Sequence, residues 1–162
     1  MAFIHNAENV VFLGPPDVGK THLSIALGMG AVMNGMPVYY ISAVKLVQTF
    51  KKDYDLKRLE YRIQTYSRFK LMIVDEIGYL PLAREESNLF FQFVSSRYEK
   101  RCTIYTSNKA FSEWVEVLGD SVMASTLLDR ILHHCVVINV KGESYRLKDR
   151  RKNSLAAAGV KL

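Results

Sequence analysis

The chain has 162 residues, of which 49% are hydrophobic and 23% are charged. This balance is that of one globular domain with a sizeable core, and it excludes a disordered or fibrous chain. No long uncharged apolar run indicates a membrane span, and the N-terminus has neither the basic start nor the apolar centre of a signal peptide. Two cysteines without CxxC spacing argue against a disulfide framework or a cysteine zinc site, so a cytoplasmic location is expected.

The net charge of +6 is unevenly distributed. Residues 45–70 contain eight Lys or Arg against three Asp or Glu, and residues 141–162 contain seven against two. The remainder of the chain carries a small negative charge. Two basic segments on such a body favour a polyanionic partner, and the alternative is that both are merely solvated faces.

Apolar runs alternate with helical patterns along the chain. Strands are expected at 9–13, 37–41, 70–75, 102–106 and 135–140, and helices near 20–34, 43–67, 86–100 and 121–134. Continuous apolar strands are typical of a parallel sheet covered on both faces, so the alternation predicts a doubly wound α/β domain over 1–150. The stretch 43–67 is long enough for two helices broken near Asp53–Asp55, and 151–162 is expected to be a disordered basic and alanine-rich tail.

A phosphate-binding loop is predicted directly after the first strand. The segment matches GxxxxGK[ST] and consists of Gly14, Pro15, Pro16, Asp17, Val18, Gly19, Lys20 and Thr21. Such a loop turns backbone N–H groups toward phosphates, and its glycines avoid side-chain collisions. Lys20 would reach the β- and γ-phosphates of ATP, and Thr21 would offer its hydroxyl to Mg²⁺. The alternative is an ordinary Gly/Pro-rich turn between a strand and a helix.

Two adjacent acids follow the third predicted strand. Asp75 is suited to hold Mg²⁺, and Glu76 can orient and deprotonate an attacking water. A nucleotide kinase does not need the second acid because its substrate supplies the nucleophile. The alternative is that both acids only cap a helix. The fourth strand runs into Thr106-Ser107-Asn108, where a polar side chain could align the water, or where Ser-Asn could simply form a turn.

The motifs GPPDVGKTHL, IVDEIGYLP, TSNK, LLDRILHH and GESYRLK, in this order and spacing, resemble the IstB/DnaC type of AAA+ ATPases, and most specifically IstB-like helper ATPases of insertion-sequence transposition. The resemblance covers residues 3–150. It implies a P-loop AAA+ domain with a five-stranded parallel sheet of order 5-1-4-3-2, helices on both faces and no large C-terminal lid.

The resemblance also implies roles for three further residues. Asn108 matches the sensor-1 position, Arg130 matches the arginine finger that reaches the ATP of a neighbouring subunit, and Arg146 matches sensor 2. An arginine supplied in trans can neutralise charge on the transferring phosphoryl group. The alternatives are a surface pair of Arg130 with Asp129 or with a neighbouring helix, and a place for Arg146 in the basic tail.

The implied function is an ATP- and Mg²⁺-dependent ATPase that self-assembles on DNA and assists a transposase. The alternatives are a DnaC-like helicase loader and a nucleotide-binding scaffold with negligible turnover. The helical element after the second strand would help to assemble subunits around DNA. The expected phosphate contacts are Lys51, Lys52, Lys57, Arg58, Arg150 and Arg151.

Two features of the sequence depart from the family pattern, and three histidines are not expected to bind a metal. IstB-like chains usually carry another domain before the ATPase module, so this sequence is expected to be an isolated module or a truncated chain. Asp17 stands where relatives commonly have Gly, and its charge should oppose phosphate binding. His22, His133 and His134 lack carboxylate or cysteine partners at ligand spacing, so packing or surface exposure, rather than metal binding, is expected for them.

Overall fold

A five-stranded, all-parallel sheet forms the centre of the protein. The computed structural model describes residues 1–79, 81–142 and 144. The strands are β1 (Asn9–Leu13), β2 (Val38–Ser42), β3 (Leu71–Ile77), β4 (Cys102–Ser107) and β5 (Cys135–Asn139). Their order is β2-β3-β4-β1-β5, which confirms the predicted α/β class and sheet order.

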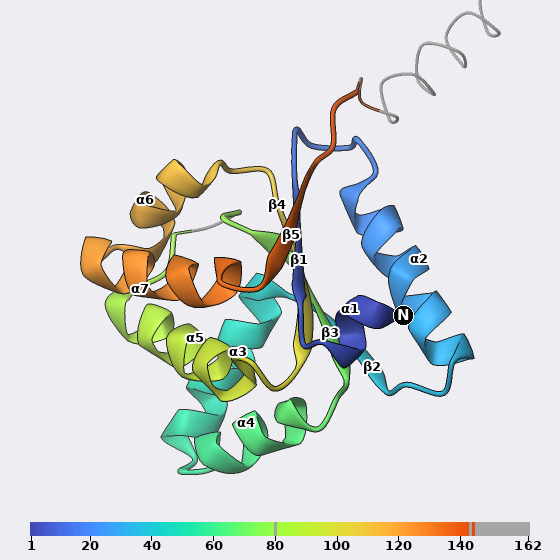
Figure 1. Cartoon of the computed structure of the whole chain (residues 1–162). Helices are drawn as coiled ribbons and strands as arrows, with labels where there is room; N and C mark the ends of the chain where they lie inside the picture. Colours follow the sequence, from blue (N-terminus) through green and yellow to red (C-terminus); the bar gives the residue numbers. More distant parts are fainter. Residues whose placement is uncertain (80, 143, 145–162) are drawn as a thin grey trace, which may run out of the picture.

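Helices cover both faces of the sheet unequally. One face carries the short α1 (Ala2–His5) and α2 (Lys20–Met33), whereas the opposite face carries all other helices (Figure 1). These are α3 (Ala43–Asp55), α4 (Leu59–Ser67), α5 (Arg84–Arg97), η1 (Phe111–Glu113), α6 (Trp114–Leu118) and α7 (Ser121–Leu132). Within the described residues no helix is long and apolar enough to cross a membrane.

Alternation along the strands divides the core into two clusters. Val11 and Tyr105 pack with the helices of the crowded face, whereas Val10 and Ile104 pack with α1 and α2. Successive strand residues point to opposite faces, so a strand buried on both sides is apolar at nearly every position. The two-sided sheet therefore explains the continuous apolar runs of the sequence.

The structure differs from the sequence-based expectations mainly at the ends of elements and in short helices. The break between α3 and α4 lies at residues 56–58, because α3 continues through Asp55. Asp53 is buried inside α3 and accepts hydrogen bonds or ion pairs from Arg58 and Arg62. The elements α1, η1 and α6 are too short for a periodic signal. The expectations for Arg146, Arg150, Arg151 and the tail 151–162 lie outside the described residues.

Candidate nucleotide-binding site

The predicted phosphate loop connects β1 to α2 at the carboxyl edge of the sheet. Gly14 follows β1 directly, and a Cβ at this position would lie 2.1 Å from the carbonyl oxygen of Val140. Only glycine fits beside the chain that leaves β5. Gly19 has φ +100° and is the N-cap of α2, so the loop leads straight into the positive end of a 14-residue helix.

Lys20 is held across this loop by its ammonium group. Its Nζ donates to the carbonyl oxygens of Gly14 at 2.7 Å and Pro15 at 2.6 Å. Burial lowers the pKa of Lys20, while the negative charges of Asp75, Asp17 and Glu76 partly oppose that shift. The lysine is therefore a buried cation close to all three acids.

Asp75 is the centre of a buried hydrogen-bond network. Thr21 Oγ1 lies 3.1 and 3.2 Å from its two carboxylate oxygens, and the hydroxyl of Thr106 donates to Oδ1. Tyr40, on β2, donates its phenol to Oδ2 at 2.6 Å. Tyr40 lies in the strand predicted at 37–41, and the sequence did not indicate this contact. In the β2–β3 register, Tyr40 pairs with Ile73, two residues before Asp75. Knowledge of this register would have indicated the contact between Tyr40 and Asp75.

The oxygen atoms around Asp75 fit the predicted Mg²⁺ ion. Asp75 is 3% exposed, and the neutral hydroxyls of Thr21, Tyr40 and Thr106 donate to its carboxylate. A buried carboxylate is expensive without a cation, and carboxylate and hydroxyl oxygens are ligands that Mg²⁺ accepts. Thr21 and Asp75 are therefore the residues that would hold the ion, beside the Lys20 ammonium.

Glu76 leaves the sheet through a bulge. Its φ is +61°, and the β3–β4 register shifts between Val74 and Ile77. Asp75 and Ile77 are buried, whereas the Glu76 side chain is exposed. The charge of Glu76 contributes to the raised pKa of Tyr40, after burial and the contacts of Asp75, so the two side chains are close enough to interact. Its backbone N–H donates to Thr106 Oγ1 at 2.9 Å, which fixes the bulge to β4.

Asn108 lies on the same edge, immediately after β4. The preceding Ser107 pairs with Leu13 of β1 on one side and Ile77 of β3 on the other. Asn108 is exposed in the turn between the ends of these two strands. The structure thus brings Asn108 to the edge formed by the phosphate loop and the two acids.

Arg130 is not part of this group within one chain. The adjacent Ile131 accepts a hydrogen bond from Asn9 Nδ2 at 3.0 Å, at the start of β1. The phosphate loop begins after the end of that five-residue strand, roughly 15 Å further along. The Arg130 guanidinium lies 4.6 Å from the centre of the Phe91 ring and donates to Ser95, both on α5. The alternative pair with Asp129 is not among the ion pairs of the described residues, whereas the alternative contact with a neighbouring helix is present, on α5.

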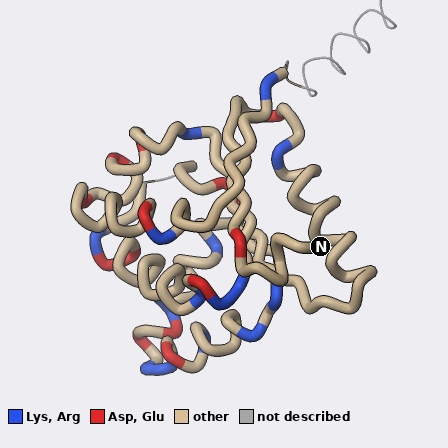
Figure 2. The backbone as a smooth tube through the Cα atoms, viewed as in Figure 1, with Lys and Arg blue, Asp and Glu red and all other residues tan. Residues whose placement is uncertain are grey.

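The predicted DNA-contacting cations on α3 and after it fall into two groups. Lys51 lies 3.5 Å from Glu86, and Arg58 lies 3.7 Å from Asp53. Lys52 and Lys57 are exposed and have no ion pair within the described part of the chain. Figure 2 shows acidic positions among the basic ones over α3 and α4, so the local field is weaker than the basic count suggests.

Comparisons with known proteins identify the family of the chain. Residues 1–153 match the family model of the IstB-like ATP-binding proteins. The chain is 51% identical over 152 residues to an ATP-binding protein of insertion sequence IS21 from Pseudomonas aeruginosa, covering 94% of this chain and 57% of that protein. It is 44% identical over 151 residues to the corresponding protein of IS5376 from Geobacillus stearothermophilus, covering 93% and 60%. The chain thus spans less than two thirds of the length of these relatives.

Solved structures share the fold at lower sequence identity. The DnaC helicase loader superposes with a TM-score of 0.72 at 21% identity, covering 86% of this chain and 85% of that one. AMPPCP-bound DnaA from Aquifex aeolicus gives a TM-score of 0.72 at 22% identity, covering 99% and 50%. These likenesses establish the AAA+ fold.

Proposed function

The chain belongs to the family of IstB-like ATP-binding proteins, and from this membership we propose that it hydrolyses ATP, assembles with copies of itself on DNA and assists a transposase. The observation that carries the proposal is the arrangement of Lys20, Thr21, Asp75 and Glu76 around one loop at the carboxyl edge of the sheet.

Each of these residues has a distinct role in the proposed reaction. Lys20 exchanges its two carbonyl partners for the β- and γ-phosphates, which compensate its burial better than neutral oxygens do. Thr21 and Asp75 would hold Mg²⁺, which would neutralise charge on the phosphate oxygens. Glu76 holds the attacking water and takes its proton, and Asn108 helps to align that water.

The position of Arg130 supports assembly. It lies about one strand length from the phosphate loop of its own chain, so it can reach an ATP only in a neighbouring subunit. We therefore assign Arg130 as the finger in trans, and Arg146, outside the described residues, as a second arginine at the nucleotide. Lys51, Lys52, Lys57, Arg58, Arg150 and Arg151 are proposed to contact DNA phosphates without base specificity.

The insertion-sequence names of the relatives favour a transposase over a replicative helicase as the partner. A helicase loader is the second candidate, because the DnaC loader shares the fold over most of both chains. Co-purification with a transposase of an IS21-like element, compared with co-purification with a replicative helicase, separates the two partners.

A mixing experiment tests the shared ATP site. Glu76→Gln and Arg130→Ala should each bind ATP and each hydrolyse it poorly on DNA. A mixture should recover part of the activity, because one interface then combines an intact Glu76 with an intact Arg130. No recovery in an assembly shown to contain both variants would place Arg130 outside the hydrolytic interface. Unchanged low turnover of the native chain with and without DNA would instead favour the nucleotide-binding scaffold.

A further inference from the structure

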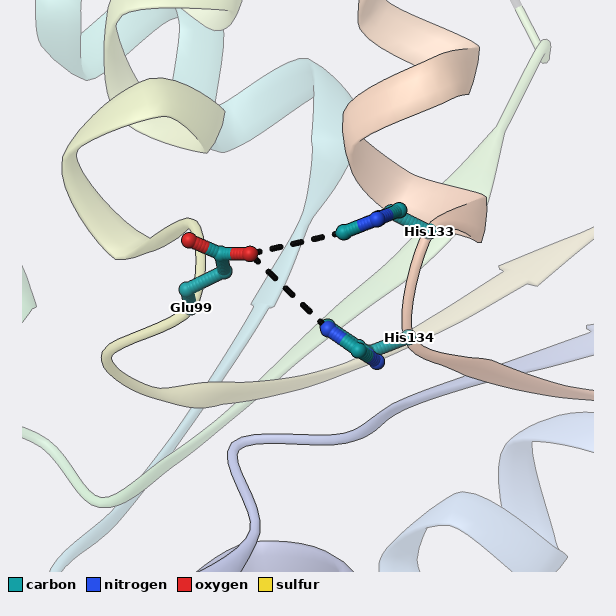
Figure 3. A group of neighbouring side chains, drawn as sticks. All are labelled: Glu99, His133 and His134. Carbon is teal, nitrogen blue, oxygen red and sulfur yellow. Dashed lines mark ion pairs between the residues drawn. The ribbon is translucent and has the colours of Figure 1, made fainter.

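A cluster of possible metal ligands lies at the amino edge of the sheet, away from the nucleotide site. Glu99 is in the loop between α5 and β4, His133 is the C-cap of α7, and His134 precedes β5. All three side chains are exposed and point toward one another (Figure 3). Both histidines are exposed, as the sequence predicted, and although no carboxylate stands at ligand spacing in the sequence, the fold brings Glu99 to them from 34 positions away.

The distances between the ligand atoms match those of a metal site. Glu99 Oε1 lies 3.5 Å from His133 Nδ1 and 3.8 Å from His134 Nε2, and all three atoms lie within 4.8 Å of one another. Ligands about 2.1 Å from a tetrahedral metal ion are separated by roughly 3.4 Å. Small side-chain rotations would close the triangle, because none of the three groups is buried.

We propose that Glu99, His133 and His134 bind a divalent transition-metal ion of the Zn²⁺ class. Two imidazoles and one carboxylate favour Zn²⁺, Co²⁺ or Ni²⁺ over Mg²⁺, which prefers oxygen ligands. Water completes the coordination because the site faces solvent. The ion would join the ends of α5 and α7 to the start of β5 on the side where Arg130 lies.

Tyr98 provides an internal test of this geometry. Its hydroxyl lies 2.8 Å from His133 Nδ1, the same nitrogen that the metal would use. Because one nitrogen lone pair cannot serve both partners, metal binding must displace the tyrosine hydroxyl. Tyr98→Phe should therefore bind the metal at least as tightly as the native chain does. In a cluster held together only by hydrogen bonds and ion pairs, the same substitution would remove a partner of His133 and would not improve metal binding.

The experiment uses the 162-residue chain without a polyhistidine tag, and Zn²⁺ or Co²⁺ as the probe. Calorimetry should find one strong Zn²⁺ site per chain, and Co²⁺ should show the visible absorption of a nitrogen- and oxygen-ligated ion. Glu99→Gln and His134→Ala should each weaken Zn²⁺ binding about tenfold or more, through loss of one of three ligands. Excess Mg²⁺ should not compete.

Three controls separate this site from others. His5→Ala removes an exposed histidine on α1, Cys135→Ser removes a half-buried thiol, and Asp75→Asn removes the buried acid of the nucleotide site. All three should retain the Zn²⁺ site, and circular dichroism without metal should show that the ligand variants remain folded. Equal Zn²⁺ affinity in the native chain, Glu99→Gln and His134→Ala, or loss of the Co²⁺ spectrum in Cys135→Ser, would overturn the proposal.

Discussion

The two edges of the sheet use buried polar groups in opposite ways. At the carboxyl edge, Lys20 bonds to loop carbonyls and Asp75 bonds to three hydroxyls, all of which a ligand can replace. At the amino edge, Arg97 is 2% exposed and donates to Thr103 and to three backbone carbonyls, those of Tyr66, Phe69 and Cys102.

This difference shows that burial alone does not identify a functional charge. Arg97 makes four hydrogen bonds, which join the end of α5 to the chain before β3 and to the start of β4, so its bonds are structural. Lys20 makes only two hydrogen bonds, both to carbonyls of a loop, and Asp75 is bonded by hydroxyls, so a charged ligand would offer both groups stronger partners. A buried charged group indicates a binding site better than burial alone does when its hydrogen bonds within the protein are weaker than those that a ligand could offer.

The largest expected effect belongs to the carboxyl edge. Glu76→Gln should lower ATP hydrolysis by about a hundredfold or more, through loss of the general base, while ATP affinity stays within a factor of two or so. Steady-state phosphate release and calorimetric titration measure the two quantities. Glu85→Gln, which changes an exposed acid in the first turn of α5, is the matched control. Full turnover in Glu76→Gln would remove this residue from the mechanism.

The amino edge should show its largest effect in stability instead. Burial lowers the pKa of Arg97 to about 10, so the guanidinium is still charged at neutral pH. It can therefore donate all four of the hydrogen bonds described above. Arg97→Met leaves several buried acceptors without a donor and should lower the free energy of unfolding by about 3 kcal/mol. Arg130→Ala loses one half-exposed hydrogen bond and ring contacts, and should cost about 1 kcal/mol or less. Urea denaturation compares the two, and equal losses would contradict the distinction.

Asp17 tests whether the carboxyl edge is optimised for phosphate. Its φ is +61°, a conformation that glycine adopts more readily, and its charge acts on the pKa of Lys20. Removing a net repulsion on the order of 1 kcal/mol, together with the backbone cost, should tighten ATP·Mg²⁺ binding about fivefold to tenfold in Asp17→Gly. Asp17→Asn removes only the charge. Equal dissociation constants in all three proteins would mean that the carboxylate does not oppose the phosphates.

The smallest effect concerns DNA and the surface that belongs to neither edge. Lys52→Ala should reduce the slope of log affinity against log salt by about 0.9, which is roughly a threefold to fourfold change in affinity between 50 and 200 mM salt. Lys51→Ala should change the slope less, because Lys51 already pairs with Glu86. Fluorescence anisotropy with a mixed-sequence duplex measures both slopes. Identical slopes in both variants and the native chain would mean that residues 45–70 are a solvated face that does not contact DNA.

The sequence was sufficient for the fold because its signals were local. Each predicted strand is a continuous apolar run, which indicates a parallel sheet buried on both faces. Since the phosphate loop and Asp75 each follow such a strand, the sequence predicted that Lys20, Thr21 and Asp75 lie close together. The short helices α1, η1 and α6 were missed because three to five residues carry no period.

The remaining features depend on contacts between distant elements. Tyr40 meets Asp75 through the β2–β3 register, and Glu99 meets His133 through the packing of α5 against α7. Nothing in the neighbourhood of Asp53 showed that an acid in the basic segment would be buried and would hold Arg58 and Arg62. Tertiary pairing decides such positions.

The bulge at Glu76 limits which amino acids the chain can place there. Side chains take turns between the faces of a flat strand, so Asp75 and its neighbour would point to opposite sides. The left-handed backbone at position 76 interrupts this alternation, and the side chain of Ile77 is again buried in the core. A branched residue such as valine would resist the conformation, and glycine or asparagine would accept it without an acid. Among the twenty amino acids, only aspartate and glutamate combine an unbranched Cβ with a carboxylate, and aspartate is one methylene shorter.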